Sequence, residues 1–189
     1  MLRSQRQHFD SLFEAESDPW GYRTRFSERR RHALALAMLD RPAYGQAFEP
    51  GCANGVLTTQ LAHRCAALLA SDASPAAVAL AMQATAHQPN VTIVQQELPL
   101  EWPACRFDLV VLVDFLYYVA PSEVAELTAL AAGSLTTGGT LVVAHWRGSA
   151  DDFLTSTDDV HAIVRDIVGS PAASRLVDRD HLIDLWIRS

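Results

Sequence analysis

Short apolar runs alternate with alanine-rich segments along most of this chain, and this alternation constrains the fold more than any other feature. Continuous apolar runs are typical of strands buried on both faces, and most of the segments between them have the length and composition of helices. The alternation predicts an α/β fold, a doubly wound and mostly parallel sheet with helices on both faces. The predicted strands are 46–49, 67–70, 91–94, 109–113 and 140–143, and the predicted helices between them are 55–64, 75–86 and 122–134.

The last part of the chain is predicted to add an antiparallel edge to the sheet. A helix is expected after Asp158, followed by strands at about 174–178 and 182–187. The connection between these two strands is too short for a parallel crossover, so they are expected to pair as a hairpin. The complete prediction is a seven-stranded sheet.

The first 42 residues have little strand character. A short amphipathic helix is predicted around Phe9 and Phe13, and the stretch 18–21, which contains Pro and Gly, ends it. A second helix is predicted over 26–40. No repeat or Gly/Ser linker divides the chain, so we expect one domain, 1–189, in which residues 1–42 form a helical lid on a core of 43–189.

Arginine supplies all 15 basic residues, and the chain contains no lysine. This composition excludes the P-loop lysine, the kinase strand lysine and Schiff-base chemistry. The 22 acidic residues bring the net charge to −7, which disfavours a nucleic-acid partner. Neither a secretion leader nor a membrane span is indicated, so a cytoplasmic protein that binds a small molecule is expected.

The first predicted strand ends in a glycine-containing turn, residues 49–55. In a doubly wound sheet the ligand lies at this end of the strands. A dinucleotide fingerprint that starts at Gly51 would need glycines where the chain has Ala53 and Val56. NAD and FAD are therefore disfavoured, and the two retained glycines, Gly51 and Gly55, suit a ligand that crosses the turn without a phosphate.

Acidic residues stand at the ends of four predicted strands: Glu49, Asp72, Glu97 and Asp114. A carboxylate at the end of the second strand is placed to accept hydrogen bonds from both hydroxyls of a ribose. Four carboxylates would repel a pyrophosphate, but they would attract an adenosine that carries a sulfonium and an ammonium group. Solvated turn residues are the ordinary alternative for any one of these acids, but the set of four favours a ligand site.

This arrangement resembles the class I S-adenosylmethionine-dependent methyltransferases over residues 48–147. The resemblance implies S-adenosyl-L-methionine as the cofactor and a set of contacts to each of its parts. These contacts are Glu49 and Gly51 beside the methionine part, Asp72 on the ribose, Ala73, Glu97 and Leu98 around the adenine, and Asp114 under the cofactor at the entrance to the acceptor site.

Several strings spread over nearly the whole chain are similar to a narrower family. They are Asp18-Pro19-Trp20-Gly21-Tyr22-Arg23, the turn 49–58, Phe107-Asp108-Leu109-Val110-Val111-Leu112, Leu116-Tyr117-Tyr118, His145-Trp146-Arg147 and Asp159-Val160-His161. They resemble the small methyltransferases related to nodulation protein S, which N-methylates a deacetylated chitooligosaccharide. The likeness implies methyl transfer to the amine of an amino sugar or a related metabolite. The chain departs from the family at Val113-Asp114, where Ser-Glu is usual.

Three residues after the N-terminal helix are candidates for a lid on the cofactor: Trp20, Tyr22 and Arg23. An aromatic face beside a sulfonium gains a cation–π attraction of roughly 0.5–2 kcal/mol and excludes water. An arginine there can pair with the cofactor carboxylate. The alternative for Trp20 is that it attaches the N-terminal helix to the sheet.

Because an amine must attack unprotonated, an acid or imidazole on the acceptor side is useful. The candidate catalytic residues are Asp114, Tyr117, Tyr118 and His145. A structural histidine is the alternative for His145. Arg29, Arg30 and Arg31 are expected on a solvated helix face.

No metal site is predicted, because the acidic pairs 151–152 and 158–159 are typical of solvated or helix-capping residues. Three alternatives to N-methyl transfer stay open: an O-methyltransferase of a small natural product, a nucleotide-dependent oxidoreductase on the same fold, and a cofactor-binding module without turnover.

Overall fold

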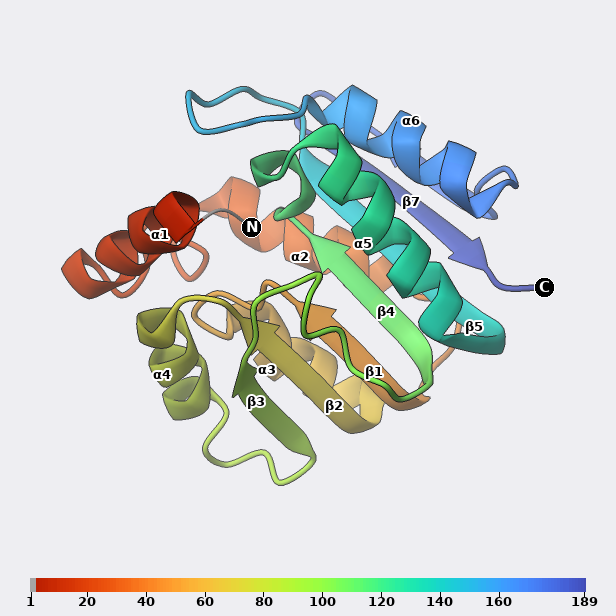
Figure 1. The fold of residues 1–189 in the computed structure, drawn as a ribbon. Coiled ribbons are helices and arrows are strands. Elements are labelled where there is room, and N and C mark those ends of the chain that lie inside the picture. The colour runs from red at the N-terminus through yellow and green to blue at the C-terminus, as the bar shows by residue number, and fades with distance from the viewer. Residues whose placement is uncertain (1–2) are drawn as a thin grey trace.

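The protein was analysed as a computed structural model that describes residues 3–189, with side chains from residue 6 onward. Its seven strands form one sheet in the order β3-β2-β1-β4-β5-β7-β6 (Figure 1). The strands are β1 Tyr44–Pro50, β2 Cys65–Asp72, β3 Val91–Gln95, β4 Phe107–Val113, β5 Leu135–Trp146, β6 Ser174–Val177 and β7 His181–Ile187. The predicted doubly wound sheet with an antiparallel edge hairpin is confirmed, because the pairs β5–β7 and β7–β6 are antiparallel and the pairs among β1 to β5 are parallel.

Helices cover both faces of this sheet (Figure 1). They are α1 Arg3–Ala15, α2 Phe26–Met38, α3 Val56–Leu61, α4 Pro75–Ala84, α5 Pro121–Ser134 and α6 Thr157–Val168, with short 3-10 turns at Ala62–Arg64 and Leu116–Tyr118. None of the helices in the described part of the chain is long and apolar enough to cross a membrane.

The central strand β4 shows how a continuous apolar sequence serves two cores. Its residues Leu109, Val111 and Val113 pack in the cluster that α2 and α3 cover. Val110 and Leu112 alternate with them and pack in the cluster under α5 and α6. Burial of both sets is the physical reason why the run contains no polar residue.

β5 is longer than the predicted 140–143, because it is paired on both sides. It pairs with β4 as far back as Leu135 and with β7 as far as Trp146. Backbone hydrogen bonds to two neighbours thus extend this strand through residues that carry no apolar signal, including Gly138 and Gly139.

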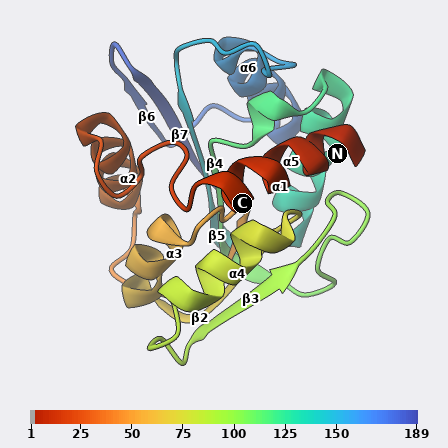
Figure 2. The same ribbon diagram turned by 90° about the vertical axis from the view of Figure 1, so that its left-hand side faces the viewer.

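The N-terminal segment lies across the C-terminal ends of the strands, next to α4, as the view in Figure 2 shows. The Asp10 carboxylate accepts hydrogen bonds from Ser74 Oγ (2.7 Å) and the Ala76 amide (3.1 Å) at the start of α4. Farther along, Asn54 Nδ2 donates to the Ser17 carbonyl (2.9 Å) and the Asp18 carboxylate (3.1 Å). The segment is therefore attached at two points, to α4 and to the turn after β1.

Candidate active site

A cavity opens where the strand order reverses, between the C-terminal ends of β1 and β4. Ligands of doubly wound sheets bind at this position. Residues that follow β1, β2, β3 and β4 line it, and α1 and the segment after it close one side. The lining includes Gly51, Ala53, Asp72, Ala73, Gln96, Leu98, Asp114, Phe115 and Tyr118 from the core, and Phe9, Phe13, Trp20 and Tyr22 from the N-terminal segment.

The turn after β1 depends on its two glycines. Gly51 and Gly55 have φ of +71° and +76°, in the left-handed region. A Cβ at Gly51 would lie 3.0 Å from Phe115 Cβ, and one at Gly55 would lie 2.9 Å from Ala81 Cα in α4. The turn is thus held close to the helix and to the end of β4. Ala53, between the glycines, has φ of +51°, which is strained for a residue with a side chain.

Asp72 connects this turn to the end of β2. Its carboxylate accepts hydrogen bonds from the backbone amides of Ala53 (3.0 Å) and Ser74 (2.9 Å). Burial raises the pKa of Asp72 above its ordinary value, although these amides favour the charged form. Each of its oxygens accepts one backbone hydrogen bond and keeps a lone pair for a ligand that donates.

Glu49 lines a second cleft together with His32 and Asn54, and this cleft adjoins the cavity because Gly51 and Asp114 line both. The residue is 3% exposed, and its Oε2 has no hydrogen-bond partner in the described part of the chain. Burial raises the pKa of Glu49 to about 8. A buried acceptor without a partner beside a glycine turn is suited to a cationic ligand group.

The raised pKa of Glu49 predicts a pH-dependent stability. The unfolded chain releases this proton near its ordinary pKa, about 4.5, whereas the folded protein keeps it until about pH 8. This contribution to the free energy of unfolding is complete below pH 4.5 and is lost as the pH rises through 8. Relative to Glu49→Gln, the wild type should therefore lose about 1 kcal/mol per pH unit between pH 5 and 8 in denaturant titrations.

The control for that measurement is Glu126→Gln, since Glu126 is an exposed glutamate on α5. Its difference from the wild type should not change over the same pH range. A Glu49→Gln difference that is equally flat would contradict the assignment of Glu49 as a buried acid.

Asp114 follows β4 and is held by three groups. Tyr117 Oη donates to its Oδ1 (2.9 Å), as does the Trp146 amide (3.0 Å), and Arg31 pairs with its Oδ2. The backbone of Asp114 is left-handed, with φ of +53°. Burial raises the pKa of its carboxyl group, and the Arg31 guanidinium opposes that rise. The predicted acceptor-side carboxylate is therefore a fixed, neutralised group and not a freely solvated acid.

The expected solvated face at residues 29–31 is wrong for Arg31. Arg29 is exposed, but the side chain of Arg31 is only 3% exposed and pairs with both Glu28 and Asp114. The cause is the packing of α2 against β5 and β7, which turns this position toward the end of β4. The three-residue spacing of Glu28 and Arg31 indicates that these two side chains can pair on one helix face. The sequence carries no signal for the second partner of Arg31, Asp114, which follows β4.

Trp20 combines a place in the cavity lining with a contact to the N-terminal helix, whereas its contact with the cofactor stays a prediction. It lines the cavity, and its ring also packs against Phe13 (5.3 Å between centroids) and stacks on Tyr22 (5.8 Å). Phe9 extends this group to Tyr118 (4.8 Å between centroids), which also lines the cavity. Aromatic rings from the N-terminal segment thus form one wall of the cavity.

Several predicted site residues lie outside the cavity lining. Arg23 is exposed, and its backbone amide donates to Asp18 (3.0 Å). Glu97 is half exposed and pairs with Arg6 of α1, while its neighbours in sequence, Gln96 and Leu98, line the cavity. Cofactor contacts by Arg23 and Glu97 stay predictions.

The remaining predicted site residues lie around the cavity without lining it. Gly55 is the N-cap of α3. Tyr117 is buried behind Asp114, and His145 is fully buried at the end of β5, in contact with the Tyr117 ring. His32, which the sequence analysis did not select, lines the cleft, and burial lowers its pKa to about 3.

The fold and the position of the cavity are those of the class I methyltransferases. The N-methyltransferase NodS from Bradyrhizobium japonicum WM9, solved with S-adenosyl-L-homocysteine, superposes with a TM-score of 0.83 over 96% of this chain and 97% of that one, at 24% identity. A crystal structure described as a candidate methyltransferase from Pseudomonas syringae is 39% identical, has a TM-score of 0.77, and covers 87% of this chain and 100% of that one.

The chain belongs to the nodulation protein S (NodS) family, whose model matches residues 6–144. Nodulation protein S from Rhizobium tropici is 32% identical over 143 residues, which are 73% of this chain and 57% of that protein. The chain spans about half the length of the curated relatives that it matches.

Proposed function

We propose that this protein is an S-adenosyl-L-methionine-dependent methyltransferase that acts on the amine of a small acceptor, with an amino sugar favoured. The observation that carries the proposal is the half-buried Asp72 carboxylate, which two backbone amides hold at the wall of the cavity. Family membership and the class I fold support the same activity.

The residues of the cavity fit this cofactor. Asp72 keeps acceptor capacity for two ribose hydroxyls, and Ala73 and Leu98 offer apolar surface for an adenine. Glu49 supplies a carboxyl oxygen without a hydrogen-bond partner in the described structure. An ammonium group beside it would favour the charged form of this carboxyl group. The charged side chains in the described lining are those of Asp72 and Asp114, with no arginine, so a cationic ligand is favoured over a pyrophosphate.

The chain's own residues have two tasks in methyl transfer. When bound, S-adenosyl-L-methionine would supply a methyl group on a sulfonium, whose carbon an acceptor lone pair can attack while S-adenosyl-L-homocysteine leaves with the S–C electron pair. The aromatic wall of Phe9, Trp20 and Tyr22 excludes water from that centre. Asp114, fixed by Arg31 and Tyr117, orients an N–H group of the acceptor so that the lone pair faces the methyl group.

An amine acceptor agrees with the charges around the site. A hydroxyl acceptor would need a base to remove its proton, and Asp114 is poorly suited to that task because it pairs with Arg31 and accepts from Tyr117 and the Trp146 amide. The lone pair that remains on its Oδ2 can still accept from an amine N–H group. The ring of Tyr118 lines the acceptor side of the cavity and offers a stacking surface for a sugar. The description of the solved relative as an N-methyltransferase supports the same choice.

The proposal is tested in two steps. In calorimetry, S-adenosyl-L-homocysteine should bind and NAD should not. With methyl-labelled cofactor, transfer should occur to members of a panel of amino sugars and amines, and not to matched compounds in which a hydroxyl replaces the amine. Binding of NAD alone would identify an oxidoreductase, transfer only to hydroxyls would identify an O-methyltransferase, and tight binding without any transfer would identify a non-catalytic module.

A further inference from the structure

A chain of hydrogen-bonded polar side chains lies inside the apolar core between α6 and the sheet. Asp184 of β7 is 2.7 Å from Nδ1 of His161 on α6, and Nε2 of His161 is 3.1 Å from Nδ1 of His145 on β5. All three residues are at most 2% exposed. They connect three elements that are adjacent in Figure 1, and none of the three residues takes part in the mechanism proposed above.

The direction of these hydrogen bonds fixes where each proton lies. A carboxylate accepts, so His161 donates from Nδ1 and, when neutral, accepts at Nε2. His145 must then carry its proton on Nδ1, and its Nε2 has only a lone pair. That Nε2 has no hydrogen-bond partner among the residues that the structure describes.

A neutral His161 agrees with the charge around Asp184. The guanidinium of Arg175 lies 3.3 Å from Oδ1 of Asp184, on the side away from His161, and the Arg175 side chain is 46% exposed. Asp184 thus already has a cationic partner, and a second cation at the fully buried His161 would be uncompensated. Burial also keeps His145 neutral by lowering its pKa well below the ordinary value.

His145, at one end of this row of hydrogen-bonded side chains, contacts Tyr117 beside the cavity. The His145 ring packs edge-on against the Tyr117 ring, with 5.1 Å between centroids. Tyr117 in turn donates to Asp114, and its carbonyl accepts from the amides of Leu154 (2.8 Å) and Thr155 (3.2 Å). The orientation of His145 therefore bears on the residue that holds the acceptor-side carboxylate.

We propose that Asp184 and His161 form a buried tautomer relay that fixes the Nδ1–H form and the orientation of His145, and that His145 positions Tyr117 and, through it, Asp114. These three residues are positioning residues, since none of them lines the cavity. The effect on transfer rests on the proposed function, whereas the tautomers and the position of Tyr117 do not.

Asp184→Asn tests the relay, because Arg175 fixes which way the new amide group faces. The guanidinium requires an acceptor at Oδ1, so the new amide should present its oxygen to Arg175 and its NH2 group to His161. His161 must then accept at Nδ1 and donate from Nε2, and His145 must move its proton to Nε2. In two-bond ¹H–¹⁵N spectra of histidine-labelled protein, wild-type His145 should show the Nδ1–H pattern and Asp184→Asn should reverse it.

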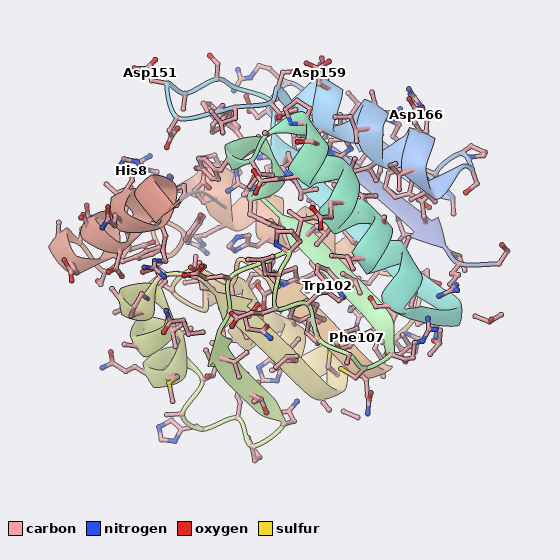
Figure 3. The ribbon with its side chains drawn as sticks, viewed as in Figure 1. His8, Trp102, Phe107, Asp151, Asp159 and Asp166 are labelled. Carbon is pink, nitrogen blue, oxygen red and sulfur yellow. The ribbon has the colours of Figure 1, made fainter. Side chains whose placement is uncertain are left out.

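Two further variants separate the relay from simple packing. His161→Gln keeps an amide oxygen that can accept from His145, so it should preserve the Nδ1–H form, whereas His161→Leu should lose it. Asp166→Asn, at an exposed position of α6 (Figure 3), makes the same chemical change as Asp184→Asn and should alter nothing.

The positioning role is read out at Tyr117 and in turnover. In ¹³C-tyrosine spectra, assigned with Tyr117→Phe, the Tyr117 ring signals should shift in Asp184→Asn and not in Asp166→Asn. With an acceptor found in the panel, kcat should fall about 10-fold while the Kd for S-adenosyl-L-homocysteine stays within about twofold. An Nε2–H form of His145 or a protonated His161 in the wild type would overturn the relay. An unshifted Tyr117 or an unchanged kcat in Asp184→Asn would overturn the positioning role.

Discussion

Replacing Arg31 with methionine should lower the free energy of unfolding by about 3–5 kcal/mol. The guanidinium compensates two carboxylates, those of Asp114 and Glu28, whose side chains are 6% and 14% exposed. Removal of one partner leaves the others in a poorly solvated place without a counter-charge, and that loss exceeds the net value of the ion pairs themselves. Denaturant titrations at pH 7.5 measure the effect.

The pH dependence of the Arg31→Met effect identifies its origin. Burial already raises the folded-state pKa of Asp114 above that of the unfolded chain, and loss of Arg31, which opposes this rise, should raise it further. A group with a raised pKa contributes stability at low pH and loses it as the pH rises. The destabilisation should therefore shrink as the pH is lowered toward about 4, where the carboxyl group is protonated in the unfolded chain too.

The control for Arg31→Met is Arg29→Met, on the same helix at an exposed position. It should change the free energy of unfolding by no more than about 0.5 kcal/mol. Equal effects of the two substitutions, or an Arg31→Met effect that does not vary with pH, would show that the buried charge on Asp114 is not what Arg31 compensates.

Asp72→Ala should weaken the binding of S-adenosyl-L-homocysteine about 100-fold. A hydrogen bond to a charged group contributes about 1.5–3 kcal/mol, and the carboxylate has acceptor capacity for two ribose hydroxyls. Calorimetry measures the loss. Asp108→Ala is the matched control, because Asp108 also accepts from two backbone amides, those of Gly45 and Gln46, but at the opposite end of β1. The affinity of Asp108→Ala for S-adenosyl-L-homocysteine should stay within about twofold of the wild-type value.

A second ligand separates the ribose contact from the support that Asp72 gives to the turn through Ala53. The 2′-deoxyribose analogue of S-adenosyl-L-homocysteine should bind the wild type more weakly than the parent compound. In Asp72→Ala the two ligands should bind equally, since the acceptor for the missing hydroxyl is gone. If both proteins bind the 2′-deoxyribose analogue more weakly than the parent compound by the same factor, Asp72 does not contact the ribose.

The fold was predictable because its signals are local. Apolar runs such as 109–113 and the helical segments between them are each readable within a window of about a dozen residues. The places where the prediction fell short depend on pairing. β5 begins at Leu135, which pairs with Phe107 of β4, and ends at Trp146, which pairs with His181 of β7. No residue within β5 indicates these pairings.

The cavity could be predicted only in part for the same reason. Gly51 and Asp72 were found because strand ends in this fold meet at one edge. Arg31 was missed, because its partner Asp114 is far away in the sequence and only the packing of α2 brings them together. The connection between His145, His161 and Asp184 likewise depends on three elements that are separate in the chain.

The two attachments of the N-terminal segment bear on how ligands enter and leave. Asp10 attaches the segment to α4, and Asn54 attaches it to the glycine turn. The segment therefore passes over the strand ends and is held on both sides of them. We expect an adenosyl compound to exchange more slowly while both attachments are formed. The rate of product release would then depend on how fast these polar contacts break. The order in which cofactor and acceptor bind would depend on which of them lies deeper beneath the segment.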